Sequence, residues 1–300
     1  MDIQNTDALP EYIRDFINNN KDKLIEEDPT ADADERDLLY DILEENNSEI
    51  NLVRYTTSEI DSLFKEVNYN LKDVRDTKLV KPIDIGLLPN EIKNIANTKK
   101  RKDMFIKIVL PLIVKENNKI RVDRKRLFKI LNKNSNTEIE KKWLEKKYKQ
   151  YGVRKNDLST LKVRMDEIPV SLAIAQAAKE TGWGTSRFAR EGNALFGEWT
   201  WQKNTGIKPL QKLNANYSVK SFTNITESLN SYILNLNRHD AYKEMRSYRQ
   251  KKIINGKEVS GYETANFLNG YAEIGYVYVT KVKEMIISNK LYKFDNLHLD

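Results

Sequence analysis

Residues 169–180, PVSLAIAQAAKE, restrict the fold more than any other segment of the 300-residue chain. The segment is rich in alanine and apolar on nearly every side, and a helix with that pattern has to lie buried among other elements. Pro169 suits the first helical position, and Gly182 and Gly184 predict that the helix stops just before them. Other helices must cover this one, so we expect a mainly α fold.

The rest of the chain supplies such helices and one short β excursion. Apolar spacing predicts a first helix, capped by Asp103 or Thr98, that runs to about 117. Pro111 lies inside this first helix and predicts a kink. Further helices are predicted at about 118–132, 136–150, 156–164, 224–237, 239–250, 261–269 and 276–289. Residues 197–222 mix aromatic and polar side chains around Gly206 and Pro209, which predicts a small β lobe.

Charge divides the chain into two predicted domains. Residues 1–60 contain 17 acidic and 5 basic residues, a net charge of −12, and the remainder carries +19. We place the boundary near residue 85, where prolines and a glycine precede a basic cluster. Residues 1–84 are then an acidic, partly ordered helical arm. Residues 85–300 form the main domain, helical over 85–196, β over 197–222 and helical over 223–300.

Composition excludes several kinds of chemistry. The chain has no cysteine, so it has no disulfide, thiolate metal site or thiol nucleophile. With only two histidines and no calcium-loop spacing, we expect no metal and no cofactor. The basic body suits an anionic partner or is simply a solvated surface. No recognition motif favours nucleic acid, and the longest apolar run, seven residues from Ile108 to Val114, is too short to span a bilayer.

Glu180 is the strongest candidate for catalysis. It lies on a small-residue face of the buried helix, four residues after Gln176, and close to Trp183. Desolvation and the negative end of the helix dipole should both raise the pKa of its carboxyl group. A carboxylic acid that stays protonated near neutral pH suits general-acid catalysis. The alternative interpretation is an exposed glutamate at a frayed helix end.

A glycine-bounded loop and an aromatic cluster follow Glu180. In the loop Gly192–Gly197, Asn193 can cap or brace the backbone. The cluster, which lies within a stretch of nineteen residues, consists of Trp183, Phe196, Trp199 and Trp201. Aromatic faces can stack on sugar rings, but packing in the core explains such residues equally well. His239, in the turn between two predicted helices, suits capping or packing.

The stretch PVSLAIAQAAKETGWGTSRFAREGNALFGEWTW (169–201) resembles the signature of glycoside hydrolase family 73, and more narrowly its Bax-like glucosaminidases. The matching positions are Ser171, Leu172, Ala173, Gln176, Ala177, Glu180, Gly182, Trp183, Gly184, Ser186, Phe188, Ala189, Asn193, Leu195, Phe196 and Gly197. Residues 228–246 also resemble this subgroup, and the resemblance covers about residues 85–300.

The resemblance implies a lysozyme-like helical domain with a β lobe across a cleft. It implies hydrolysis of the β-1,4 bond between N-acetylglucosamine and N-acetylmuramic acid in peptidoglycan, so the expected partners are peptidoglycan glycan strands. Glu180 takes the position of the catalytic acid, and Tyr271 that of a tyrosine that orients substrate or supports the acid. The candidate substrate contacts are Gln176, Trp183, Asn193, Phe196, Trp199, Trp201 and Tyr278.

The sequence does not identify the second catalytic group. Glu198 is the first candidate because it is the only acidic residue in 198–222, and Glu191 and Glu273 are others. The 2-acetamido group of the substrate can also act as nucleophile. Two alternatives keep the same fold, a non-hydrolytic glycan-binding or morphogenetic protein and a lytic transglycosylase. The sequence leaves the oligomeric state open.

Localisation follows from the expected substrate rather than from a targeting segment. Peptidoglycan places the protein in the cell envelope or periplasm. The first residues, MDIQNTDALPEYIRDF, have neither a basic start nor an apolar run, so no signal peptide is visible in them.

Overall fold

A computed structural model describes residues 38, 52–202, 205–208, 216–271 and 275–300. The described chain forms two compact units. Leu127–Asn156 belongs to the first, and Leu52–Arg126 with Asp157–Asp300 forms the second. The second unit contains Glu180 and the whole predicted β lobe, so the fold is described mainly there.

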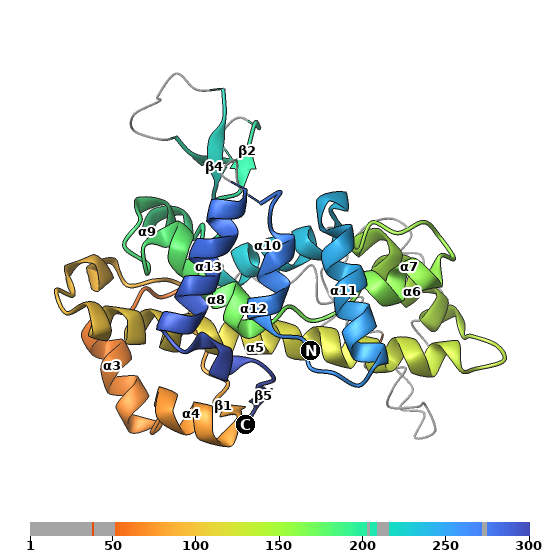
Figure 1. The fold of residues 1–300 in the computed structure, drawn as a ribbon, viewed down its shortest axis with the longest axis horizontal. Helices are drawn as coiled ribbons and strands as arrows, with labels where there is room; N and C mark the ends of the chain where they lie inside the picture. The colour runs from red at the N-terminus through yellow and green to blue at the C-terminus, as the bar shows by residue number, and fades with distance from the viewer. Residues whose placement is uncertain (1–37, 39–51, 203–204, 209–215, 272–274) are drawn as a thin grey trace, which may run out of the picture. The chain divides into compact units, whose positions relative to one another are not determined.

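The fold is mainly α with a small β part, which confirms the predicted class. The helices are α3 (Thr57–Glu66), α4 (Leu71–Thr77), α5 (Thr98–Leu131), α6 (Glu138–Gln150), α7 (Leu158–Arg164), α8 (Val170–Thr181), α9 (Arg187–Gly192), α10 (Ile225–Arg238), α11 (Lys243–Ile254), α12 (Gly261–Thr264) and α13 (Tyr276–Ser288) (Figure 1). Short 3-10 helices are η2 (Asn90–Asn94), η4 (Asp240–Tyr242), η5 (Ala265–Phe267) and η6 (Leu291–Phe294). Among the described residues, no helix is both long enough and apolar enough to cross a membrane.

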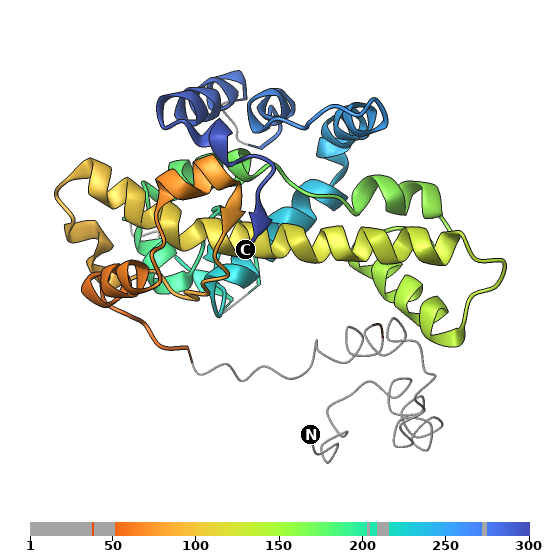
Figure 2. The same cartoon turned by 90° about the horizontal axis from the view of Figure 1, so that it is seen from below.

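Helix α8 is the buried centre of the second unit, as its composition predicts. Ten of its twelve residues are buried, and it packs against α12, α13 and η6. In Figure 2 the yellow α5 runs along one side of it, and the blue C-terminal helices lie on the other. The helix ends at Gly182, whose left-handed backbone (φ 58°) lets its N–H group bond the Ala178 carbonyl. The predicted stop is therefore confirmed.

The N-terminal end of α8 is held by a buried carboxylate from the end of the chain. Asp295 accepts hydrogen bonds from the backbone N–H (2.9 Å) and hydroxyl (2.8 Å) of Ser171, and from the N–H of Gly261 (3.0 Å). A carboxylate at a helix N-terminus satisfies N–H groups that have no partner within the helix and interacts favourably with the helix dipole. One side chain thus ties α8, α12 and the C-terminal segment together.

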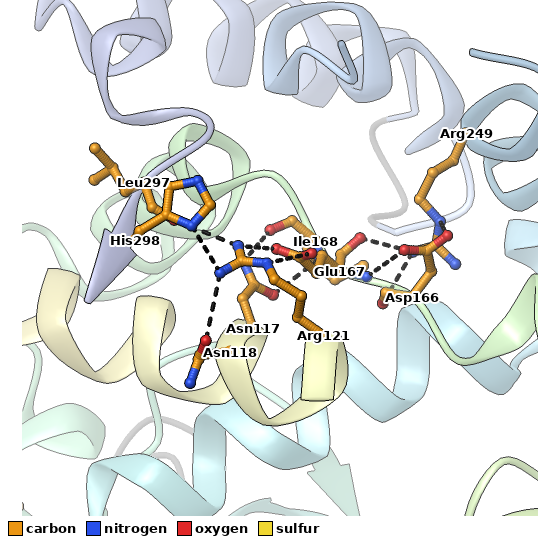
Figure 3. A network of polar contacts seen from close by, with 9 residues as sticks. All are labelled: Asn117, Asn118, Arg121, Asp166, Glu167, Ile168, Arg249, Leu297 and His298. Carbon is orange, nitrogen blue, oxygen red and sulfur yellow. Dashed lines mark hydrogen bonds and ion pairs between the residues drawn. The ribbon is translucent and has the colours of Figure 1, made fainter. Parts of the chain in front are cut away.

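The segment that leads into α8 is fixed by a polar network (Figure 3). The Asn117 amide bonds both backbone groups of Ile168, at 2.7 and 3.1 Å. The Arg121 guanidinium forms two hydrogen bonds with the Glu167 carboxylate, at 3.1 and 2.7 Å. The buried Arg249 donates to the Glu167 carbonyl (2.9 Å). Because charge-assisted and paired hydrogen bonds have well-defined geometry, this network fixes where α8 begins.

The small β lobe, residues 197–222, contains strands β2 (Trp199–Thr200), β3 (Gly206–Ile207) and β4 (Ser218–Lys220). Both β2 and β3 pair antiparallel with β4, which lies between them. All three strands fall inside the predicted β segment. A second small sheet pairs β1 (Leu79–Val80) in parallel with β5 (His298–Leu299).

Two sequence expectations need correction. Residues 98–131 form one helix, α5, rather than two, and Pro111 does not interrupt it. Proline removes one backbone hydrogen bond, but the neighbouring Leu110 and Leu112 are buried, and this packing compensates. The predicted boundary near 85 also differs from the structure, because the second unit begins at Leu52. Residues 52–84 join it through buried Phe64 and Val74 and through the β1–β5 pair.

We predict that Gly261→Ala destabilises the protein. A Cβ atom at this position would lie 2.1 Å from the Ser171 hydroxyl oxygen and 2.8 Å from the Leu172 nitrogen, so α12 would have to move away from α8. Overpacking of this kind costs about 1–3 kcal/mol of unfolding free energy. Urea unfolding followed by circular dichroism measures it.

Gly270→Ala is the matched control. Its added Cβ would meet only the Ala241 Cβ, at an ordinary 3.6 Å. Its free energy of unfolding should stay within about 0.5 kcal/mol of wild type. Equal stability of the two variants would contradict the tight α8–α12 contact.

Candidate active site

Glu180 lies in the last turn of α8, where the helix leaves the core. Ten residues of the helix are buried, but Glu180 is exposed. The loop that follows α9 passes beside it, since a Cβ atom placed on Gly197 would lie 3.6 Å from Glu180 Oε2. A buried helix thus presents one carboxylate at the surface, next to the start of the β lobe.

Its surroundings favour the protonated form. Burial of the carboxyl group against protein raises the pKa of Glu180, while the Tyr278 hydroxyl and the Lys179 ammonium oppose this rise. The side chain keeps contact with solvent on its open side. The predicted upward direction is therefore supported, with desolvation as the main cause. This combination of a raised pKa and an open side suits a group that exchanges a proton with a ligand.

A chain of polar interactions leads from Glu180 into the core. The Tyr278 hydroxyl interacts with the Glu180 carboxylate and lowers the pKa of that group. The Gln176 amide nitrogen donates to the Tyr278 hydroxyl oxygen at 3.0 Å, and the Tyr232 hydroxyl donates to the Gln176 amide oxygen at 2.8 Å. Gln176 is 0% exposed, so both ends of its amide find their partners inside the protein. It has no free surface for a substrate.

Tyr271 supports the loop rather than the carboxylate directly. Its hydroxyl donates to the Phe196 carbonyl at 3.1 Å, and its ring stacks on Tyr278 with centroids 5.2 Å apart. Burial raises the pKa of Tyr271 well above its usual range, so its hydroxyl stays protonated. Phe196 in turn stacks on Tyr232, with ring centroids 3.8 Å apart and planes inclined by 7°.

Glu198 connects the β lobe to α10. Its Oε2 accepts a hydrogen bond from the Ser231 hydroxyl at 2.7 Å and lies 3.8 Å from the Lys220 ammonium nitrogen. Burial raises the pKa of Glu198, and Ser231 and Lys220 oppose that rise. These contacts hold the carboxylate in place at the base of the lobe.

The expected substrate contacts divide into two groups. Trp199 and Trp201 are 52% and 73% exposed, and Trp199 meets Tyr217 edge-to-face at 4.6 Å. The other five are buried supports: Gln176, Trp183, Asn193, Phe196 and Tyr278. Trp183 packs edge-to-face on Phe105, with the Lys102 ammonium over its ring.

Asn193 braces the loop, as the sequence suggests. It adopts a left-handed conformation (φ 52°), and its amide donates to the carbonyls of Phe222 (2.9 Å) and Thr223 (3.0 Å). These bonds join the two ends of the lobe segment. His239 caps η4 by accepting the Ala241 N–H (3.2 Å), which agrees with its predicted capping role.

The remaining acidic candidates lie elsewhere or outside the described residues. Glu191 is exposed on α9 and lies 3.4 Å from Arg187. Glu273 lies outside the described residues. Two supporting residues, Tyr232 and Ser231, were not singled out from sequence. The apolar stripe of α10 identifies Tyr232 as a core residue, but no sequence signal shows that its hydroxyl reaches Gln176.

Comparison with known proteins identifies a family to which this chain is similar. Residues 159–291 match the family described as Glucosaminidase: Mannosyl-glycoprotein endo-beta-N-acetylglucosaminidase. The chain is 33% identical over 189 residues to Protein bax of Escherichia coli (strain K12). The match covers 59% of this chain and 66% of Protein bax, which is just under two thirds of that protein's length. No solved structure gives a significant match. Residues 159–291 therefore match a glucosaminidase domain, and the identity to Protein bax supports the Bax-like resemblance seen in the motif.

We predict that Glu180 titrates above the ordinary glutamate value of 4.5, because burial disfavours its charged form. Carbon-13 NMR of the side-chain carboxyl groups measures this directly, and Glu180→Gln identifies the signal by its loss. Glu59 serves as an internal contrast, since hydrogen bonds from Thr56 lower its pKa. A Glu180 signal that titrates no higher than that of Glu59 would rule out the environment described here.

Proposed function

We propose that the protein is a glycosidase that cleaves the β-1,4 bond between N-acetylglucosamine and N-acetylmuramic acid in peptidoglycan, with Glu180 as general acid. The observation that carries the proposal is the position of Glu180 at the solvent-exposed end of a buried helix, beside Gly197 at the start of the β lobe, where burial also raises the pKa of its carboxyl group. The glucosaminidase match of residues 159–291 supports the reaction class.

In this proposal Glu180 starts the reaction in its protonated form. It gives its proton to the glycosidic oxygen while the bond from that oxygen to the anomeric carbon breaks. Activity that needs a protonated general acid is lost as the pH rises through the pKa of that acid. Because burial raises the pKa of Glu180, the acid remains available at higher pH than an exposed glutamate would.

The contacts of Glu198 favour a nucleophile supplied by the substrate. To attack the anomeric carbon, Glu198 would have to leave Ser231 and Lys220, which hold it at the base of the lobe. The 2-acetamido oxygen of the N-acetylglucosamine unit already lies next to the anomeric carbon and needs no such movement. It closes a ring on that carbon as the leaving group departs. Water then opens the ring, giving its proton to the Glu180 carboxylate and restoring the acid.

The β lobe supplies a surface for the glycan strand. Trp199 and Trp201 present large exposed aromatic faces directly after Glu198. Such faces pack well on the apolar faces of sugar rings. The net charge of +19 beyond residue 60 suits an anionic wall polymer, and the substrate implies action in the cell envelope.

We predict that Glu180→Gln lowers hydrolysis of purified peptidoglycan by about a thousandfold, because glutamine cannot donate the proton. Mass spectrometry of the reduced digestion products measures the loss and identifies the bond. Wild type should release fragments that end in reducing N-acetylglucosamine. Glu244→Gln, an exposed position on α11, is the matched control and should retain full activity.

The product ends decide between the reaction classes. Anhydro-muramyl ends would instead identify a lytic transglycosylase, which uses a single acid without water. An active, folded Glu180→Gln variant would remove Glu180 from its proposed role. Absence of products from folded wild type would favour a protein that binds glycan without cleaving it.

We predict that Trp199→Ala weakens binding to insoluble peptidoglycan about fivefold, which corresponds to about 1 kcal/mol. Co-sedimentation measures this, with Glu180→Gln in every variant so that the substrate is not cut. Tyr292→Ala removes an exposed aromatic ring (44% exposed) from η6 and should bind as the parent does. Unchanged binding of Trp199→Ala would assign the ring to packing on Tyr217.

A further inference from the structure

Five residues are linked into a closed circuit near Glu180 by hydrogen bonds and stacked aromatic rings. Tyr232 bonds Gln176 through its hydroxyl and stacks on Phe196 through its ring. The Phe196 carbonyl accepts a hydrogen bond from Tyr271, which stacks on Tyr278. Tyr278 closes the circuit by accepting the Gln176 amide hydrogen. The circuit joins α8, α10, α13, the segment before α13 and the loop after α9, and the hydroxyl of its member Tyr278 interacts with Glu180.

In each hydrogen bond of the circuit, the next hydrogen bond along determines which group donates and which accepts. The Tyr232 hydroxyl donates to the Gln176 amide oxygen, which fixes the amide nitrogen on the side of Tyr278. That nitrogen can only donate, so the Tyr278 oxygen accepts and its single proton remains free for another partner. An ionised Glu180 carboxylate can only accept, and it is the partner that lies there.

We propose that Gln176 and Tyr232 are positioning residues, which hold the Tyr278 hydroxyl so that its proton points at the Glu180 carboxylate. The inference rests on the proposed role of Glu180 as the acid. Tyr278 then occupies one carboxylate oxygen, and the acidic proton sits on the other, which is free to meet the glycosidic oxygen. Linked hydrogen bonds strengthen one another, so the whole chain acts on the acid.

Among the described residues, the titratable groups that interact with the Glu180 carboxyl group come from three segments. Lys179 lies beside it on α8, Tyr278 reaches it from α13, and Tyr271 interacts with it from the segment before α13. Lys179 and the Tyr278 hydroxyl both lower the pKa of Glu180. Loss of the Tyr278 proton, or of its orientation, should therefore move the pKa of Glu180 further upward.

The test compares Tyr278→Phe with Gln176→Met and Tyr232→Phe. Tyr278→Phe removes the hydroxyl that contacts Glu180. Gln176→Met keeps side-chain length but removes both hydrogen bonds, and Tyr232→Phe removes one hydroxyl while keeping the ring stack. NMR titration of the Glu180 carboxyl should show an upward pKa shift in all three, largest for Tyr278→Phe. Adding Gln176→Met to Tyr278→Phe should give no further shift, because the two residues act through one contact.

Kinetics supply the second readout. Each variant should lower kcat on peptidoglycan about tenfold, with KM nearly unchanged and the high-pH limb of kcat displaced upward. Tyr69→Phe is the matched control because it removes a buried tyrosine hydroxyl without a hydrogen-bond partner. This variant should change neither kcat nor the position of its high-pH limb. Thermal unfolding confirms that every variant compared is folded.

The outcomes separate this inference from the proposed function. The NMR titration needs no activity, so an upward shift of Glu180 in the three variants supports the circuit even if wild type hydrolyses nothing. A shift in Tyr278→Phe alone would show that Gln176 and Tyr232 do not orient the hydroxyl. An unshifted Glu180 in Tyr278→Phe would overturn the inference entirely, whatever the digest shows.

Discussion

The burial of α8, in which ten of twelve residues are buried, is the constraint on which the rest of the second unit depends. A helix without a polar face has to be enclosed, and α5, α12, α13 and η6 enclose it. Its polar ends then need partners inside the protein. Asp295 supplies them at the start, and the turn at Gly182 supplies them at the end. Both ends are therefore fixed, and the position of Glu180 is fixed with them.

This rigidity has a chemical use. A carboxyl group on a loop would lower its own pKa by moving into water. The backbone of Glu180 belongs to the packed helix α8, so the group is held where burial raises its pKa. In the proposed circuit, Gln176 also orients the Tyr278 hydroxyl toward the Glu180 carboxylate. Stability and the proposed acid chemistry thus depend on the same helix.

The β lobe follows a different principle, since its strands are only two or three residues long. Strands of that length have little stability of their own. The lobe is anchored at its base instead, by Glu198 on Ser231 of α10 and by the Asn193 amide on two backbone carbonyls. Trp199 and Trp201 can therefore stand exposed above an anchored base, which suits a surface for an extended polymer.

The sequence by itself determined the buried helix, its stop, the mainly α class, the β segment and the candidate acid, because these depend on local pattern and on a long family motif. It did not reveal that residues 98–131 form one helix rather than two, or that residues 52–84 join the main unit. Those outcomes depend on packing between segments far apart in the chain. For the same reason only the tertiary structure separated the exposed Trp199 from the buried Gln176. Spacing places both near Glu180, but the folded neighbours decide which side chain faces solvent and which faces a tyrosine.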